Sequence, residues 1–285
     1  MSYRIITDSC SDLDSQMIAR LDLVVVPLNV ECGGQVFEDG KIDPKEFYNG
    51  MRSGKTYKTS AVNPQRWAQE MEPILSGGED LLVLAFSSGL STTYQSAVIA
   101  AEELKEKYPQ RKMQVVDTLA ASLGQGLLVY YAAQQRQAGK SMEEVAQWVE
   151  DNKNHLAHWF TVDDLMHLKR GGRVGAATAV MGTMLQIKPV LHVDNDGKLI
   201  NMSKARGRKA ALNALTEHVA QEGLPGQNDV MFICHSDCIE DAEFVANAVK
   251  EKYGVKEVYI HYIGSVIGSH TGPGTVGLFF LAEHK

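Results

Sequence analysis

Short apolar runs alternate with longer amphipathic stretches through the first half of the chain. Apolar runs of about four to eight residues between turn residues predict buried strands, and the amphipathic stretches between them predict helices. Strands that alternate with helices are typical of β-α units around a largely parallel sheet. We therefore expect an α/β amino-terminal half whose strands include YRIIT, LDLVVVPLNV, LLVLAF and MQVVDT.

One helix is marked clearly after the run LLVLAF. Apolar residues recur at three- and four-residue spacing from Tyr94 to Tyr108, and a proline follows directly. This spacing predicts a helix that begins near Ser91 or Thr92. Thr92 and Gln95 also have the spacing of a capping box, in which two side chains satisfy the first backbone N–H groups of the helix.

The second half of the chain shows a different order of elements. SMEEVAQWVEDN predicts a helix with a capping box of Ser141 and Glu144, and the polar stretch at 152–154 marks a domain boundary. IKPVLHV, the turn DNDG and KLINMSKA then predict an antiparallel hairpin. The expected architecture is two α/β domains, 1–154 with a largely parallel sheet and 155–285 with a mixed sheet.

The charge balance excludes some classes of protein. The chain has 285 residues, 28 basic and 35 acidic side chains, and a net charge of -7. Nucleic acid and anionic membranes attract surplus positive charge, so we expect no nucleic-acid partner. No apolar run approaches the roughly 20 residues of a membrane span, and the amino terminus lacks the apolar core of a signal peptide. We expect a cytoplasmic protein without stable membrane insertion.

The cysteine pattern indicates free thiols. Four cysteines, Cys10, Cys32, Cys234 and Cys238, are too few and too scattered for a disulfide framework, which agrees with a reducing compartment. CHSDC contains two of them, but no second ligand pair accompanies it, so a strand end is favoured over a zinc site. We expect no bound metal.

Uncharged hydrogen-bond donors gather at the entrances of predicted helices. FSSGLSTTYQSA contains Ser91 and Thr92, KTSAVNP contains Thr59 and Ser60, and TDSCSDL follows the first strand. The first N–H groups of a helix lack partners and the helix dipole is positive there, so hydroxyls beside them form an anion site. Loops of this kind gather at the carboxyl edge of an α/β sheet, where ligands bind. For a single stretch, helix capping is as good an explanation as anion binding. Capping does not explain why three such stretches occur in one chain.

A histidine near the carboxyl terminus admits two interpretations. His270 lies among glycines in GSHTGPG, where its imidazole can donate to an anion or move a proton. Alternatively, the turn SGLST resembles the nucleophile elbow of a hydrolase, and Ser91, Asp117 and His270 occur in the order of a catalytic triad. The elbow requires glycine where Thr93 stands. A serine esterase is therefore the alternative, not the favoured function.

Two basic clusters stand out on this acidic chain. They are LKRGGR, which contains Arg173, and SKARGRK, which contains Arg206. Arginine binds phosphate oxygens through paired hydrogen bonds, so either cluster fits a phosphate or an acidic partner, although a solvated surface is the simpler explanation. Neither cluster has the frame of a P-loop, so we expect no ATP hydrolysis by this chain alone. An adaptor that recruits an acidic protein without lipid is a third hypothesis.

Eight motifs in sequence order make the chain resemble the DegV family of bacterial fatty-acid-binding proteins. They extend from Thr7 to Gly277, nearly the whole chain, and are TDSCSDL, KTSAVNP, FSSGLSTTYQSA, VDTLAASLGQG, DDLMHLKRGGRVG, MLQIKPVL, KARGRK and SHTGPGTVG. The resemblance implies a two-domain α/β protein that holds one long-chain fatty acid at the domain junction. It also implies that the protein presents the carboxylate to a separate ATP-dependent fatty acid kinase subunit, which forms the acyl phosphate. The chain itself would then be a lipid-binding carrier subunit with no catalytic residues and no cofactor.

The same resemblance assigns residues to the fatty-acid head group and to the kinase. Neutral hydroxyl and N–H donors can hold a carboxylate without a buried lysine or arginine, because they stabilise the charge directly. Thr92 stands where the family usually has glycine, which affects the head-group pocket. The carboxylate ligands implied are Thr59, Ser60, Ser91, Thr92 and His270. Arg173 and Arg206 match family arginines implied in the site or in kinase docking.

Overall fold

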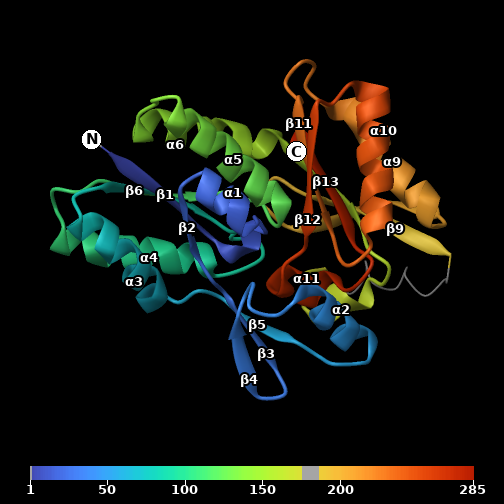
Figure 1. The fold of residues 1–285 in the computed structure, drawn as a ribbon, viewed down its shortest axis with the longest axis horizontal. Helices are drawn as coiled ribbons and strands as arrows, with labels where there is room; N and C mark the ends of the chain where they lie inside the picture. Colours follow the sequence, from blue (N-terminus) through green and yellow to red (C-terminus); the bar gives the residue numbers. More distant parts are fainter. Residues whose placement is uncertain (1, 175–185) are drawn as a thin grey trace.

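The first half of the protein is built on a parallel four-stranded sheet (Figure 1). Its order is β2-β1-β6-β7, so the chain passes from one side of β1 to the other after β2. Open α/β sheets bind ligands beyond the carboxyl ends of their strands at such a reversal. In this computed structural model, which describes residues 2–174 and 186–285, the strands are β1 (Tyr3–Asp8), β2 (Leu23–Val26), β6 (Asp80–Ala85) and β7 (Met113–Asp117).

Helices cover both faces of this sheet, because consecutive strand residues point to opposite sides. Ile6 and Leu81 pack with α3 and α4 on one face, and Ile5 and Leu82 pack with α1, α5 and α6 on the other. Burial on both faces explains why these strands are continuous hydrophobic runs in the sequence. The helices are α1 (Ser15–Arg20), α3 (Pro64–Ser76), α4 (Thr93–Lys107), α5 (Leu123–Gln137) and α6 (Met142–Asn152).

A small antiparallel sheet and one helix extend from the first half, between β2 and α3, to contact the second half. Pro27 interrupts LDLVVVPLNV, and the chain on either side of it forms β2 and β3. The Tyr48 hydroxyl donates to the carbonyl oxygen of Ile263 at 2.7 Å, and the Tyr48 ring lies against Gly268 of α11 (Ser265–Thr271). In Figure 1 this segment lies beside α11. Its elements are β3 (Asn29–Cys32), β4 (Gln35–Glu38), α2 (Pro44–Arg52) and β5 (Lys58–Ser60).

The second half is built on a six-stranded mixed sheet in the order β10-β9-β8-β13-β11-β12. Within this sheet, β11 and β12 form the one parallel pair among the described strands, and the other neighbouring strands pair antiparallel. The elements are β8 (Leu156–Thr161), α7 (Met166–Arg170), β9 (Ile187–Val193), β10 (Leu199–Arg206), α9 (Arg208–Glu222), β11 (Val230–His235), α10 (Ile239–Tyr253), β12 (Glu257–Tyr262), α11 (Ser265–Thr271) and β13 (Val276–Leu281).

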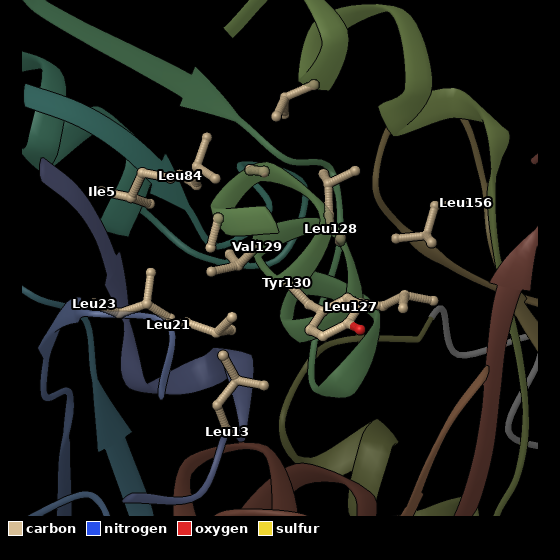
Figure 2. Close-up of a cluster of buried hydrophobic side chains, with 14 of the residues drawn as sticks. Ile5, Leu13, Leu21, Leu23, Leu84, Leu127, Leu128, Val129, Tyr130 and Leu156 are labelled. Atoms are coloured by element: carbon tan, nitrogen blue, oxygen red, sulfur yellow. The ribbon is translucent and has the colours of Figure 1, made fainter. Parts of the chain in front are cut away.

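Helix α5 joins the two halves through one hydrophobic core. Figure 2 shows Leu127 and Tyr130 of this helix between Ile5 of the first sheet and Leu156 of the second. The ring centroid of Tyr130 lies 5.4 Å from that of Phe232 in β11. On the far face of the mixed sheet, α9 and α10 cover a separate cluster. Because both sheets pack on α5, this shared core fixes the position of one sheet relative to the other.

The predicted α/β class, with a parallel sheet first and a mixed sheet second, is confirmed. The hairpin of IKPVLHV and KLINMSKA forms as β9 and β10, with seven paired positions from Leu199–Val193 to Arg206–Ile187. The proposed domain boundary at residue 154 lies in the short 3-10 helix Lys153–His155, directly before β8. One residue of DDLMHLKRGGRVG and two of MLQIKPVL lie outside the described residues.

The two predicted capping boxes had different outcomes. At the start of α6, Ser141 Oγ accepts the backbone N–H of Glu144, and the Glu144 carboxylate accepts the backbone N–H of Ser141. At the start of α4 the prediction is wrong, because Thr92 is the N-cap but its side chain makes no capping bond. Ser91 Oγ instead accepts the backbone N–H of Thr93 at 3.2 Å. The Ser91 hydroxyl therefore satisfies the first backbone N–H of this helix.

Candidate functional site

A cavity of about 480 Å³ lies where the two halves meet. Its volume falls in the range of about 300–1,000 Å³ that is typical of small-molecule sites. The loop after β6 and strand β5 contribute from the first half, and β8, β13 and α11 contribute from the second. Five predicted site residues line it, and Arg173 does too; the six are Thr59, Ser60, Ser91, Thr92, Arg173 and His270.

Two regions of the cavity differ in chemistry. The "polar end" consists of Thr59, Ser91, Arg173 and His270, which come from four separate segments of the chain. The "sheet wall" is the part of the mixed sheet that faces the cavity. Its residues lie on alternate positions of three strands and are His158, Phe160, Cys234 and Phe279.

The polar end is joined across the two halves by one hydrogen bond. Thr59 Oγ1, on β5, lies 2.8 Å from Nε2 of His270, on α11. If the imidazole donates this bond, the Thr59 hydroxyl keeps its proton for an acceptor in the cavity. Gly171 packs against the other edge of the ring, and a Cβ at this position would overlap Nδ1 of His270. The glycines of LKRGGR therefore include one that the imidazole requires.

The electrostatics of the polar end favour an anion. Burial, followed by the charge of Arg173, lowers the pKa of His270 to about 4, so its ring is neutral at pH 7. Arg173 is half-buried, and its guanidinium donates to the carbonyl oxygen of Leu90 from Nε at 3.3 Å and from Nη2 at 3.2 Å. It donates to the carbonyl oxygen of Gly171 as well. The guanidinium is thus held beside the hydroxyls of this end.

Arg173 changes the expected composition of the site. The resemblance implied Arg173 either for the site or for kinase docking. The structure places its guanidinium on the cavity lining, so a positive charge lies beside the neutral donors. The sequence alone could not choose between the two locations, because Leu90, whose carbonyl oxygen orients the guanidinium, lies far from Arg173 along the chain. Arg206 lies elsewhere: it is exposed on β10 and does not line the cavity.

The hydroxyls of FSSGLSTTYQSA have separate tasks. Ser91 Oγ lies 2.9 Å from Thr93 Oγ1 and faces the cavity, as Ser88 and Thr92 do. Ser87 is fully buried and donates to the carbonyl oxygen of Gly197 at 2.8 Å, in the turn of the β9–β10 hairpin. One serine therefore fastens the two halves together while its neighbours line the site.

Two buried aspartates of the first half hold the amino terminus of α11. Asp39 Oδ1 accepts the Ser265 hydroxyl at 2.7 Å and the backbone N–H of Val266 at 3.3 Å. Asp12 Oδ1 accepts the backbone N–H of Gly264 at 3.0 Å. Burial raises the pKa of both carboxyl groups. These residues position the helix that carries His270, and no sequence signal assigned them to the site.

The alternative esterase is not favoured by the geometry. Asp117 accepts the backbone N–H groups of Ser88 and Leu119, each at 3.1 Å. In the described part of the chain neither Ser91 nor Asp117 is hydrogen-bonded to His270. A serine triad requires its histidine to bond both partners. The triad of this alternative is therefore not assembled.

The described residues were also searched for metal ligands, disulfides and membrane-spanning helices. Across residues 2–174 and 186–285, no group of three or more histidine, cysteine, aspartate or glutamate side chains is arranged to hold a metal ion. All four cysteines are free thiols. In the same ranges, no helix is both long enough and apolar enough to pass through a bilayer.

Comparisons with known proteins cover the whole chain. Residues 2–283 match a family model described as "Uncharacterised protein, DegV family". A DegV domain-containing protein of Clostridium perfringens is 49% identical over 288 residues, which is 99% of this chain and 98% of the relative.

Solved structures share the fold as well. One is a DegV family protein from Thermus thermophilus, described by its fatty-acid binding, with a TM-score of 0.88 and 33% identity over 99% of this chain and 100% of that one. Another is a DegV family protein from Ruminococcus gnavus, refined with vaccenic acid, with a TM-score of 0.88 and 26% identity over 98% of this chain and 99% of that one.

Proposed function

The chain belongs to the DegV family, and we propose that it binds one long-chain fatty acid in the cavity between its two halves. One observation carries the proposal: a single cavity joins an end of hydroxyl and guanidinium donors to a lining of mostly apolar side chains. A fatty acid has the same division between a carboxylate and a hydrocarbon chain. Its binding at two solved relatives supports the assignment.

The carboxylate is assigned to the polar end. The hydroxyl groups of Thr59 and Ser91 donate hydrogen bonds to it, and Arg173 supplies the positive charge. His270 orients the Thr59 hydroxyl through the 2.8 Å contact between Nε2 and Oγ1. Charge-assisted hydrogen bonds of this kind are roughly twice as strong as neutral ones. Ser60 and Thr92, on the same lining, complete the donors around the head group.

The hydrocarbon chain is assigned to the apolar lining. About 15 methylenes at about 0.8 kcal/mol each contribute roughly 12 kcal/mol, and association costs at least about 4 kcal/mol of this. At most about 8 kcal/mol remains from the hydrocarbon chain, which corresponds to a dissociation constant of about 1 μM before the head group contributes. Lining residues that fit the chain are Leu28, Phe160, Leu199, Val266 and Phe279.

Purified protein tests the proposal directly. Protein made in bacteria is extracted with organic solvent, and the extract is analysed by mass spectrometry; we expect about one fatty acid for each chain. The delipidated protein is then titrated with stearic acid in a calorimeter. An empty extract together with no heat of binding after delipidation would refute the proposal.

We further propose that the chain is a carrier without its own catalysis and presents the carboxylate to an ATP-dependent kinase. Exposed Arg206 is the docking candidate, because it is free to bind an acidic partner and lies outside the cavity lining. Arg173 contributes to the head group, so its reversal would disturb lipid binding as well. We expect Arg206→Glu to abolish kinase-dependent acyl-phosphate formation while the affinity for stearic acid stays unchanged. Turnover at the unaltered rate would contradict docking through Arg206.

A further inference from the structure

Three carboxyl groups of the first half are buried where it meets the start of α11. They belong to Asp8, Asp12 and Asp39, and each of these residues is at most 8% exposed. Two of them meet over Gly264, the residue before the helix. The Cβ that this glycine lacks would lie 2.6 Å from Oδ1 of Asp12 and 3.4 Å from both carboxyl oxygens of Asp39. Asp12 and Asp39 therefore share one small space at the junction of the two halves.

No opposite charge compensates these carboxyl groups in the part of the chain that the structure describes. The hydrogen bonds to Asp8, Asp12 and Asp39 come from hydroxyl, amide or backbone N–H groups, and none comes from a lysine, arginine or histidine. An ionised carboxylate that is buried without an opposite charge is costly. The other titratable groups that interact with Asp12 are acids as well, and they are Cys10, Tyr48, Cys234 and Tyr259.

The hydrogen bonds of Asp39 show where one proton fits. Its Oδ1 accepts the N–H groups of Gly40 and Val266 and the hydroxyl of Ser265, whereas its Oδ2 is buried and has no hydrogen-bond partner among the described residues. A protonated carboxyl group keeps Oδ1 as an acceptor and leaves no charge on Oδ2. Burial raises the pKa of Asp39, and burial followed by the charge of Asp39 raises the pKa of Asp12. Two carboxyl groups at one site thus retain a proton between them.

Helix α11 connects this pair to the fatty-acid cavity. Asp12 and Asp39 belong to the first half and hold the backbone N–H groups of Gly264 and Val266 in the second. The same helix presents Val266 and His270 to the cavity. Loss of the shared proton places two negative charges side by side in a buried space, where like charges repel strongly. This repulsion pushes the start of α11 away from the first half and loosens the site.

We propose that Asp12 and Asp39 form a pH-sensitive latch, in which one shared proton keeps α11 docked on the first half and loss of this proton weakens the hold on the fatty acid. The inference rests on the proposed function and adds regulation to the same site. Because both carboxyl groups have raised pKa values in the docked structure, docking is favoured at low pH and is weakened as pH rises through those values. One linked proton changes the affinity by at most about tenfold per pH unit.

Binding titrations across a range of pH test the latch. Delipidated protein is titrated with stearic acid in a calorimeter from pH 5 to pH 9, and we expect the wild-type affinity to fall about tenfold or more. Asp39→Asn keeps an acceptor at the Oδ1 position and has no proton to lose, so its affinity should vary by less than about threefold. Asp151→Asn, exposed on α6, removes the same formal charge from the surface and should follow the wild-type profile.

A second variant protects the test against misfolding of the first. Asp12→Asn neutralises the other member of the pair, and asparagine tolerates the left-handed backbone of this position, where φ is 52°. Its affinity should also become nearly independent of pH. The same fall in affinity in the wild type and in both variants would overturn the latch, as would a wild-type affinity that is constant from pH 5 to pH 9. Failure of stearic acid to bind the wild-type protein at any pH would instead refute the proposed function.

Discussion

The polar end and the sheet wall of one cavity are constructed in opposite ways. The polar end brings together Thr59, Ser91, Arg173 and His270 from four separate segments, and none is a sequence neighbour of another. The sheet wall uses alternate positions of adjacent strands, such as His158 and Phe160 of β8. Strand alternation alone aligns the wall. The residues of the polar end come together only when the two halves of the protein pack against each other.

This difference predicts where substitutions act. A substitution at the polar end removes a hydrogen-bond donor that only the tertiary structure puts in position. The loss of affinity should come from the contact with the carboxylate and not from contacts with the hydrocarbon chain. A change at the sheet wall alters contact with the chain, where each methylene contributes about 0.8 kcal/mol. Large, specific losses of affinity are therefore expected at the polar end, and small, distributed ones at the wall.

The largest effect is expected from Thr59→Ala combined with Ser91→Ala. Each hydroxyl bond to a charged group is worth about 1.5–3 kcal/mol, so the double variant should weaken stearic acid binding at least about a hundredfold. Calorimetric titration measures the change. Phe160→Leu at the sheet wall is the comparison and should cost less than about tenfold. Equal losses in the two proteins would contradict the division of the cavity.

A smaller effect is expected from Gly171→Ala. The new Cβ overlaps Nδ1 of His270, so the ring must shift and its contact with Thr59 must lengthen. We expect about tenfold weaker binding of stearic acid, with a change in melting temperature of only a few degrees. Lys169→Ala, on the exposed side of α7, serves as the control and should leave affinity unaltered. Unaltered affinity in Gly171→Ala would show that the ring does not orient the head group.

The smallest effect on ligand affinity is expected from a change of pH. Of the two histidines that line the cavity, only His270 should couple its protonation to ligand binding. The folded pKa of His270 is about 4, below the usual value of about 6.5. The unfolded chain therefore binds an extra proton between pH 6.5 and 4, and stability falls as pH decreases through this window, by at most about 1.4 kcal/mol per pH unit. A bound carboxylate should raise the pKa of His270 and reduce that loss.

Nuclear magnetic resonance titration of the imidazole signals measures this difference. Addition of stearic acid should raise the pKa of His270 and leave that of His158 below the titration range, because the hydrocarbon chain carries no charge to the sheet wall. The His270→Gln protein provides the assignment and should lose the ligand-dependent part of the pH profile. A pKa of His270 that is identical with and without ligand would place the carboxylate elsewhere.

Local features of the fold could be predicted from the sequence because they depend on nearby residues. The capping box at Ser141 forms as the spacing indicates, since its two partners are three residues apart on one helix turn. The capping box at Thr92 does not form: the Thr92 side chain makes no capping bond, and the neighbouring Ser91 Oγ accepts the N–H of Thr93. Choices among adjacent hydroxyls depend on backbone angles that spacing does not determine.

The sequence by itself determined the α/β class and the hairpin of the second half, because hydrophobic periodicity and turn chemistry act over a few residues. It also singled out hydroxyl residues that line the cavity, such as Thr59 and Ser91. Only the tertiary structure decided that Arg173 lines the cavity while Arg206 does not. The same holds for Asp12 and Asp39, which hold the start of α11 from the other half of the protein. Such contacts connect residues more than 200 positions apart, and they exist only after both sheets have packed around α5.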